Sequence, residues 1–582
     1  MTSTLQEQDE PAPEEPSSLY LLSTALFQHH YEDAPRIEHL ERSYLRAQAL
    51  GRHHGLAMHD IIALSPRFWQ VHKDYMAFRD TVAQIIVMVQ INIVAGTVAL
   101  YAAVRPDLHP LMENILNFDV IGSFMLTELD HGCDARNIET TATLQSDGSF
   151  DLHTPHPGAS KFMPPSMPVA NIPRLGIVFA RLIVRNEDLG MRAFIVPLAD
   201  KAHMRPGVQS KLLPPASGGR MLDYSLTSFN HVRIPGPSML GDFTKPTNMR
   251  TSYLSTIQRI GTGTLALNIW IATFLKGAVY IAGKYSLSRT VQQGLHGERT
   301  PIMSFRTQHL PILHALAHIA VLEPFADWVE DHYVDESLHP EVRHGLGAIL
   351  KAMSLQVGQG SLANLSERIG ARGAFIHNQI REMEALARFC GIAEGDLLVL
   401  SIRLATEIPI DRYSLPEPRH PDCLLARHET GLLFELREAI HRIPHPSHTH
   451  DPDHSNIGFH RSDAYNKHIL PRCRPLVLAI AHRMAYEAAL DASIDPNLLA
   501  LFEAEMIQTD PAWYTEHLGL SRSTQADMEE RAIDALFPRI RELVDRHDAV
   551  EPYLTAPMMS SARWDAFQAS LPTFDGRGGA RL

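Results

Sequence analysis

Residues 124–134 read FMLTELDHGCD, and the chain continues at residues 138–144 as IETTATL. An apolar run ends here in Thr-Glu and is followed by a polar turn that contains Gly132. This pattern predicts a strand that delivers the hydroxyl of Thr127 and several backbone N–H groups to one spot. Such a spot suits an anionic group or the polarisable edge of a ring. The pattern alone leaves an ordinary strand and loop open as the alternative.

The residues of this stretch resemble the flavin loop of the acyl-CoA oxidases and acyl-CoA dehydrogenases. In that family a Met-Thr-Glu, a Gly-His-Gly-like turn and a Glu-Thr-Thr-Ala-Thr lie against FAD. The resemblance implies that Thr127 forms a hydrogen bond to the flavin edge. It also implies that Gly132, Cys133 and Asp134 lie near the flavin and the pantetheine arm of the substrate.

A second stretch carries the same resemblance. FDLHTP at 150–155 and ASKFMPPS at 159–166 are similar to the oxidase motif His-Thr-Pro followed by Ala-Ala-Lys-Trp-Trp-Pro-Gly-Gly, whose second half contacts the flavin. The resemblance implies cofactor contacts at Phe162 and Ser166. Phe162 and Met163 replace the two Trp, and Pro165 and Ser166 replace glycines that let the backbone approach the ring closely. We therefore expect a reshaped acyl pocket, with a plain surface hairpin as the alternative.

Four shorter motifs match the family's β region in order and spacing. Each motif alone is weak evidence for the resemblance. Four matches in the same order and at the same spacing would rarely arise by chance. The motifs are AFIVPL at 193–198, RPGV at 205–208, LDYSL at 222–226 and VRIP at 232–235.

The helices that follow carry candidate cofactor residues. YSLSR at 285–289 and PIMSFRTQ at 301–308 resemble the family's Tyr-x-x-x-Arg and Phe-x-x-Gln. The resemblance implies that Arg289 and Gln308 reach the pyrophosphate and adenosine side of FAD, often across a subunit boundary. A guanidinium suits a pyrophosphate because its forked donors engage two oxygens at once. From the residues alone, Arg289 is equally a solvated charge on a helix surface.

The candidate catalytic residue is Glu394 in FCGIAEGD at 389–396, which resembles the family's Tyr-Glu-Gly-Asp. It is preceded by GARGAF at 370–375, which is similar to the family's Gly-Gly-x-Gly-Tyr and implies a cofactor contact at Gly373. Removing a proton next to a thioester carbonyl needs a carboxylate in a dry pocket with a raised pKa. Gly395 lets the chain turn and leaves room for substrate. A Glu favoured by a helix N-terminus is the alternative without catalysis.

Composition limits the possible partners. The chain has 582 residues, 45% hydrophobic and 20% charged, which is enough for two to four packed units. A net charge of -14 argues against broad binding to nucleic acid or anionic membranes. The four cysteines form no C-x-x-C pair, so a disulfide framework and a cysteine zinc site are both disfavoured. This usage favours a reducing compartment.

Three further stretches need separate interpretation. The apolar run at 81–104 is long enough to span a bilayer, but Gln84, Gln90 and Asn92 interrupt it, so we expect a buried helix and no membrane span. Histidines between 441 and 460 lack metal-ligand spacing and are expected in a solvated loop. The terminal Ala580-Arg581-Leu582 is similar to a peroxisomal address, which the family resemblance supports; otherwise a cytoplasmic location is expected.

Periodicity divides the chain into helical, β and helical parts. We expect an α+β, mostly α protein, and the order of parts is that of the acyl-CoA dehydrogenase fold: a helical domain, a central β-barrel or sandwich, a helical bundle and an extra helical domain. The expected boundaries are an acidic disordered tail at 1–18, an N-terminal helical domain at 19–117, a β domain at 118–245, a catalytic FAD-binding helical domain at 246–422 and a distal helical domain at 423–582.

The resemblance covers roughly residues 80–410 and implies an acyl-CoA oxidase: FAD-dependent desaturation of an acyl-CoA to the trans-2-enoyl product, with O2 reduced to H2O2. It implies a homodimer or tetramer with FAD at the subunit interface and no metal. A first alternative is a dehydrogenase-type desaturase that acts on an unusual acyl thioester of secondary metabolism and uses another electron acceptor. A second alternative is a flavin- or CoA-binding scaffold without turnover.

Overall fold

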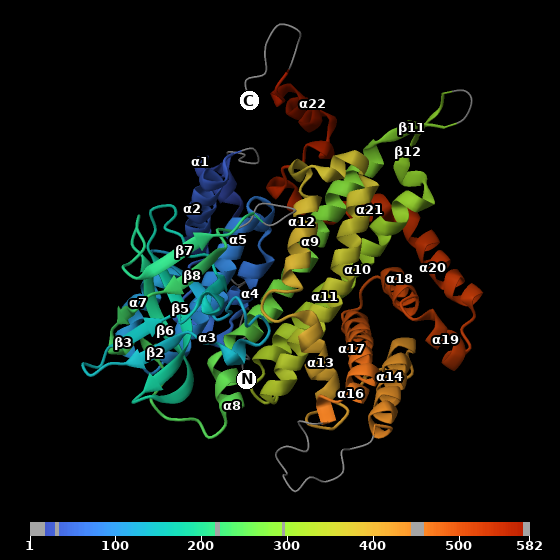
Figure 1. Ribbon diagram of the computed structural model, residues 1–582. Helices are drawn as coiled ribbons and strands as arrows, with labels where there is room; N and C mark the ends of the chain where they lie inside the picture. The colour runs from blue at the N-terminus through green and yellow to red at the C-terminus, as the bar shows by residue number, and fades with distance from the viewer. Residues whose placement is uncertain (1–17, 29–33, 216–221, 294–296, 444–458, 574–582) are drawn as a thin grey trace, which may run out of the picture.

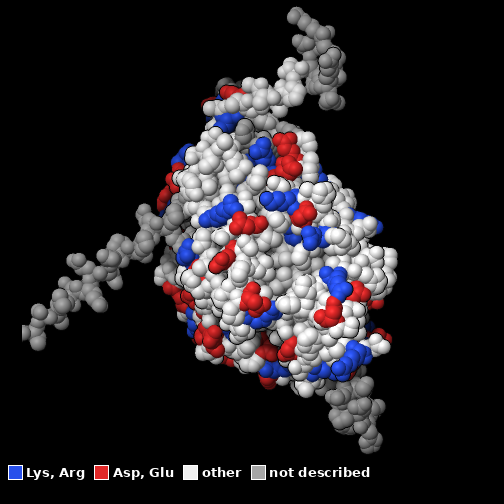
Figure 2. Space-filling model, turned by 90° about the vertical axis from the view of Figure 1, so that its left-hand side faces the viewer, with Lys and Arg blue, Asp and Glu red and all other residues white. Residues whose placement is uncertain are grey.

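The computed structural model describes residues 18–28, 34–215, 222–293, 297–443 and 459–573. In Figure 1 most strands gather on one side of the molecule and the long helices on the other, with the short pair β11 and β12 on the helical side. Figure 2 looks onto the strand side, where acidic and basic side chains are interspersed and form no patch of a single sign.

The N-terminal part is helical. Its longest run joins α5, a π-helical turn η3 and α6, and the polar residues inside that run are buried and hydrogen-bonded. Gln90 Nε2 donates to the carbonyls of Ile115 and Val120, and its Oε1 accepts from Gly122 N, each at 2.8 Å. The elements are α1 (Ala25–Gln28), α2 (Arg36–His54), α3 (Met58–Ala63), α4 (Pro66–Lys73), α5 (Thr81–Met88), η3 (Val89–Ala95), α6 (Gly96–Ala102) and α7 (His109–Leu116).

The central part contains two sheets. A seven-stranded sheet has the order β10-β6-β5-β2-β3-β9, with β1 also paired to β5, and a three-stranded sheet has the order β4-β8-β7. The strands are β1 (Ile121–Met125), β2 (Thr141–Leu144), β3 (Phe150–His153), β4 (Lys161–Met163), β5 (Arg174–Val184), β6 (Glu187–Ala199), β7 (Val208–Leu212), β8 (Ser225–Phe229), β9 (Val232–Ile234) and β10 (Met239–Leu240).

The pairing of β1 and β2 places the first motif. Both strands lie parallel to β5 and along the same edge of it: β1 ends with Met125 opposite Val178, and β2 begins with Thr141 opposite Arg181. Residues 126–140 therefore leave β5 beside Val178 and return to it beside Arg181, only three residues further along β5. The segment must project from the sheet as a loop.

A second helical part follows, built around the 30-residue helix α9. Helices α10 and α11 pack along α9, and the hairpin β11–β12 follows its C-terminal end. The elements are α8 (Met249–Thr256), α9 (Arg259–Ser288), β11 (Thr290–Gln292), β12 (Arg299–Pro301), α10 (Arg306–Val334), α11 (Pro340–Arg368), α12 (Ile380–Cys390) and α13 (Leu397–Glu407).

Further helices pack against α10 and α11, mainly through α17 and α18, and α21 contacts α9. They are α14 (Leu424–His441), α16 (Asp463–His468), α17 (Leu470–Asp491), α18 (Pro496–Ile507), α19 (Pro511–Leu518), α20 (Arg522–Leu536), α21 (Ile540–Asp545) and α22 (Ser561–Ser570). The predicted α+β, mostly helical class is confirmed. The numerical domain boundaries stay predictions.

Some element bounds differ from the sequence expectation. Helical spacing predicts a helix over 374–389, but α12 begins only at Ile380. Gly370 and Gln379 have positive φ angles of 62° and 65°, and such residues cannot continue an α-helix. A predicted helix over 524–547 is interrupted by a 3-10 turn containing Pro538, which has no N–H to donate.

Within the described ranges, three helices have the length and apolar composition of a membrane span: Thr81–Ala102, Arg259–Ser288 and Arg306–Val334. Their most apolar windows are 83%, 94% and 67% buried inside the fold. Packing within the protein therefore accounts for the apolar run at 81–104, as the sequence predicts.

Candidate active site

A buried ion pair joins the motif at 124–134 to the motif at 159–166. Lys161 Nζ lies 2.9 Å from Glu128 Oε1, and both side chains are fully buried. The Glu128 carboxylate also accepts hydrogen bonds from Thr140 Oγ1 at 2.6 Å and from the backbone N–H of Glu139 and Thr140 at 2.6 and 2.9 Å. Glu128 thereby closes the loop 126–140 and ties it to β4.

The two charges stabilise each other. Burial alone raises the pKa of Glu128, but Lys161 and the hydrogen bonds from Thr140 and Glu139 outweigh it and hold that pKa below its ordinary value. Burial lowers the pKa of Lys161 to about 8, against the attraction of Glu128. Both groups are therefore charged at neutral pH.

The loop presents its predicted ligand groups outward. Thr127 is half-buried, and its hydroxyl makes no hydrogen bond to any residue in the described part of the chain. Its carbonyl accepts the backbone N–H of Phe162 at 2.9 Å, so the two motifs lie side by side. Gly132, Cys133 and Asp134 form an exposed turn, and a Cβ at Gly132 would meet nothing within 4 Å.

The two predicted cofactor residues of the 159–166 motif, Phe162 and Ser166, differ in where their side chains point. Phe162 is half-buried beside the loop. Ser166 is buried, and its hydroxyl contacts Ser210 Oγ at 2.8 Å and Thr227 Oγ1 at 2.7 Å on β7 and β8. The Ser166 side chain is therefore engaged inside the β part, and only its backbone is free for the predicted cofactor contact.

Glu394 lies in a tight turn between α12 and α13. Its φ is +52° and that of Gly395 is +99°, both in the left-handed region. The oxygen Oε2 of Glu394 is buried without a hydrogen-bond partner among the described residues, and it lies against Gly263 on α9. Burial raises the pKa of Glu394 to about 7, against the opposing charge of Lys351. This is the behaviour expected of a general base.

The backbone of this turn is fixed by neighbouring helices. Thr264 Oγ1 on α9 donates to the Glu394 carbonyl at 2.5 Å, and Lys351 Nζ on α11 donates to the carbonyls of Ala393 and Gly395 at 2.7 Å each. The Glu394 backbone N–H, by contrast, has no acceptor within the described residues. Tyr224 from the β part stacks on Phe389 of α12 at 5.4 Å between ring centroids, which brings the β part against this end of the helices.

The remaining predicted cofactor residues gather at the opposite end of α9. Gln308 Nε2 donates to Ser286 Oγ and to the Arg368 carbonyl, at 2.9 Å each, so the ends of α9, α10 and α11 meet there. Arg289 follows α9 directly, and its exposed guanidinium has no partner in the described ranges. Gly373 is buried in the turn after α11, where a Cβ would overlap the Ser366 carbonyl.

The two groups of predicted residues are far apart. Arg289 lies 26 residues after Gly263 along a continuous helix, which corresponds to roughly 39 Å at 1.5 Å per residue. In Figure 1 the α8 end and the β11–β12 end of α9 lie at opposite ends of the molecule. This separation exceeds the reach of one extended FAD.

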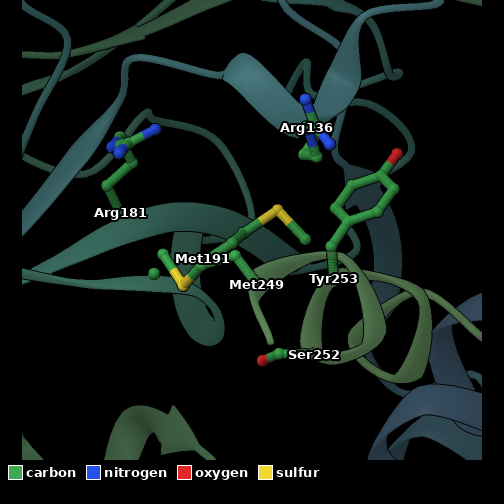
Figure 3. A pocket seen from close by; sticks show the side chains of 7 residues that line it. Arg136, Arg181, Met191, Met249, Ser252 and Tyr253 are labelled. Atoms are coloured by element: carbon green, nitrogen blue, oxygen red, sulfur yellow. The ribbon is translucent and has the colours of Figure 1, made fainter. Parts of the chain in front are cut away.

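A small pocket lies beside the exposed turn. It is lined by Arg136, Arg181, Gly190, Met191, Met249, Ser252 and Tyr253. Figure 3 shows Arg136 next to Tyr253 of α8, Arg181 on the other side, and the two methionines between them. Arg181 pairs with Asp188, whereas exposed Arg136 has no hydrogen bond or ion pair to a described residue.

Sequence reasoning missed several of these residues. Arg136 lies two residues after the predicted Asp134 and is distinguishable only by its charge. Lys351 does carry a signal, because it is the single charge in the otherwise apolar run GLGAILKAMSL at 345–355. No metal cluster of His, Cys, Asp or Glu occurs in the described ranges, and residues 444–458, which hold most of the His-rich segment, lie outside them.

Curated relatives match part of the chain. No family model matches the chain. A putative peroxisomal acyl-coenzyme A oxidase 1.2 of Arabidopsis thaliana is 27% identical over 308 residues, which cover 49% of this chain and 46% of the relative. An acyl-coenzyme A oxidase of Komagataella pastoris is 37% identical over 131 residues, 22% of this chain and 18% of that protein. By these matches, the chain spans about half the length or less of the curated relatives.

Solved structures match over more of the chain. Acyl-CoA oxidase 1 of Yarrowia lipolytica has a TM-score of 0.78 at 17% identity, covering 94% of this chain and 88% of that one. Acyl-CoA oxidase-1 of Caenorhabditis elegans, solved with FAD and ATP, has a TM-score of 0.69 at 17% identity, covering 94% and 97%. These likenesses show a shared fold that includes the distal helices. The sequence matches and the motifs at 124–144, 159–166 and 389–396 support the acyl-CoA oxidase and acyl-CoA dehydrogenase superfamily for this chain.

Proposed function

We propose that this protein is a FAD-dependent acyl-CoA oxidase that converts an acyl-CoA thioester to its trans-2-enoyl product. The observation that carries the proposal is Glu394, a buried carboxyl group whose pKa is raised to about 7. Hydrogen bonds from Thr264 and Lys351 to the carbonyls of residues 393–395 hold its turn in place. The relatives named above are oxidases, which favours O2 as the electron acceptor over a protein acceptor.

The described residues fit FAD. The Thr127 hydroxyl, which lies where the motifs at 124–134 and 159–166 meet, has no partner in the described chain. The Arg289 guanidinium at the C-terminal end of α9 likewise has no partner among the described residues. Thr127 and the backbone near Phe162 would hold the ring, and Arg289, Gln308 and Gly373 would hold the pyrophosphate and adenosine side. When bound, FAD supplies the acceptor for the hydride that leaves the β-carbon.

The separation of these two groups supports a subunit interface. One chain cannot offer both groups to one FAD, because they lie at opposite ends of α9. We therefore place each FAD between Thr127 and Glu394 of one subunit and Arg289, Gln308 and Gly373 of a second copy. A homodimer, or a tetramer built from such dimers, satisfies this arrangement.

The chemistry assigned to this chain is proton transfer and polarisation of the substrate. Ionised Glu394 takes the α-proton of the thioester, and its raised pKa matches the weak acidity of that proton. The unpaired Glu394 backbone N–H donates to the thioester carbonyl, where negative charge develops as the proton leaves. Gly395 leaves space for the substrate at the turn, and Ala393, where the family has Tyr, makes the wall smaller.

A phosphate group of the CoA moiety is assigned to the small pocket beside Cys133 and Asp134. Arg136 lines it with a guanidinium that has no partner in the described part of the chain, and guanidinium groups bind phosphate oxygens in bidentate geometry. The peroxisomal names of several relatives support a peroxisomal location. The terminal Ala580-Arg581-Leu582 proposed as its address lies outside the described residues.

The test uses the visible spectrum of the purified protein. We expect a yellow holoenzyme whose flavin band is bleached by acyl-CoA without oxygen and restored in air with one H2O2 per turnover. Glu394→Gln should keep the FAD band and lose bleaching by at least about 1,000-fold. Bleaching without peroxide in air would favour the dehydrogenase alternative. A colourless protein that does not take up FAD would refute the proposal.

A further inference from the structure

Lys351 on α11 is a fully buried cation that, among the described residues, donates hydrogen bonds to backbone carbonyls alone. Its Nζ donates to Ala393 O and Gly395 O at 2.7 Å each, and no Asp or Glu of the described residues forms an ion pair with it. Burying an ammonium group is costly, and a purely structural position would be filled at lower cost by an apolar side chain. The cost of burying Lys351 therefore indicates a role that depends on its N–H donors or on its charge.

The turn that Lys351 contacts is strained. Glu394 is a non-glycine residue at φ +52°, a conformation that persists only where the surroundings hold it. Three successive carbonyls are held here: those of residues 393 and 395 by Lys351, and that of Glu394 by Thr264. The Glu394 N–H and its oxygen Oε2 have no hydrogen-bond partner among the described residues, so both are available to other partners.

The charged and titratable surroundings of Lys351 are few. Cys390 on α12, Glu394, and Asp396 at the start of α13 face it, and no titratable group of α9 acts on the turn. Burial raises the pKa of Cys390 to about 12, so that thiol stays neutral. Burial lowers the pKa of Lys351 to about 8, so the ammonium is charged at neutral pH and is the cation that favours ionised Glu394.

We propose that Lys351 is a positioning residue for the reaction, holding the carbonyls on both sides of Glu394 so that its carboxyl group and N–H face the substrate. This inference rests on the proposed function of Glu394. Lys351 does not touch the substrate; it acts through the turn and through its charge.

Three variants separate the two effects. Lys351→Met removes donors and charge, and Lys351→Gln keeps an N–H donor without charge. Thr264→Val removes the third contact, together with a hydrogen bond to the Ile260 carbonyl within α9. We expect the Met variant to retain FAD while anaerobic flavin reduction by acyl-CoA slows about 100-fold. Its pH midpoint should rise by about one unit or more. The Gln variant should recover part of the rate with a raised midpoint, and the Val variant should lose rate with an unchanged midpoint.

A second measurement does not depend on turnover. Amide hydrogen exchange of residues 391–396 should be faster in the Met variant of the holoenzyme than in the unaltered protein. Unchanged rate, midpoint and exchange in that variant would overturn the inference. Loss of fold and FAD in both lysine variants would also overturn it, since Lys351 would then be structural. If the unaltered protein is never reduced by acyl-CoA, the proposed function fails, whereas faster exchange would still support the role of Lys351 in holding the turn.

Discussion

The carboxyl oxygen Oε2 of Glu394 lies against the Cα atom of Gly263 on α9, so closely that a Cβ at position 263 would overlap it. Gly263 is buried within a long helix, where glycine disfavours helix formation relative to alanine. Its presence is explained by the space that the Glu394 carboxyl group occupies. The two residues are 131 positions apart, and only the packing of the turn on α9 brings them together.

We predict that Gly263→Ala displaces the Glu394 side chain while FAD stays bound. The rate of flavin reduction should fall about 100-fold, because a displacement of about 1 Å is costly at a reacting centre. Rapid-mixing spectroscopy with acyl-CoA measures this rate. Gly347→Ala on α11 is the matched control, since a Cβ there would meet Leu265 at an ordinary 3.9 Å. Equal rates in the two variants would contradict the contact.

The pH dependence follows from the raised pKa of Glu394. The base works when ionised, so flavin reduction should rise with pH through about 7. Stability has the opposite sign: from the unfolded carboxyl pKa near 4.5 up to about 7, the folded state holds a proton that the unfolded state has lost, so stability falls as pH rises. Glu394→Gln removes this loss.

Thermal unfolding checks the second half of this prediction. The Gln variant should be more stable than the unaltered protein at pH 8, by at least about 1 kcal/mol. At pH 4 the two proteins should be nearly equal. A stability difference that is the same at both pH values would mean that Glu394 has an ordinary pKa.

The Glu128–Lys161 pair should be essential to the loop that carries Thr127. Glu128→Gln or Lys161→Met alone should cost about 3–5 kcal/mol of unfolding free energy, since each leaves a buried group without its partner. The double variant should cost less than the sum of the two, and all three should release FAD more easily. Denaturant unfolding and flavin fluorescence measure the two effects. The exposed pair Lys245–Glu187 is the control and should change stability by less than about 1 kcal/mol.

Sequence patterns predicted local features of the site well and packing relationships poorly. The strand at Met125, the turn at Gly132 and the glycine after Glu394 depend on neighbouring residues in the chain, so the local sequence predicts them. The adjacency of Thr127 and Phe162 was implied only by family resemblance. The inward turn of the Ser166 hydroxyl depends on Ser210 and Thr227, which reach it through the pairing of β7 and β8.

Long-range partners had no sequence signal of their own. Periodicity assigns Lys351 and Thr264 to helices, but it cannot tell which turn those helices meet. The helix predicted over 374–389 shows the same limit: the Gln379 side chain donates to Phe78 O at 2.6 Å and accepts from Thr555 N at 2.8 Å. Contacts more than 170 residues away thus engage the residue immediately before α12, and no local pattern contains that information.

Arg136 should distinguish CoA from substrates without its phosphates. We predict that Arg136→Ala raises KM for acyl-CoA about 10- to 100-fold, the loss expected for a charged hydrogen bond, with kcat unchanged. Activity on the matching acyl-pantetheine, which lacks the nucleotide, should be the same in the variant and the unaltered protein. Steady-state peroxide assays on both substrates measure this. A similar loss on acyl-pantetheine would place the role of Arg136 in folding or in another subsite.

The proposed division of each FAD site between two subunits predicts complementation. Glu394→Gln and Arg289→Ala should each abolish turnover in a homodimer, the first by removing the base and the second by weakening FAD binding. In a mixed dimer, one site combines both substitutions, while the other combines an unaltered Glu394 with the unaltered Arg289 of the second chain. Random reassembly of equal amounts should therefore restore about one quarter of the unaltered activity, because half of the dimers are mixed and each has one intact site. Peroxide production after mixing and reassembly with excess FAD measures this fraction. If Glu394 and Arg289 served the same FAD from one chain, every site in the mixture would carry one of the two substitutions, and no activity would return.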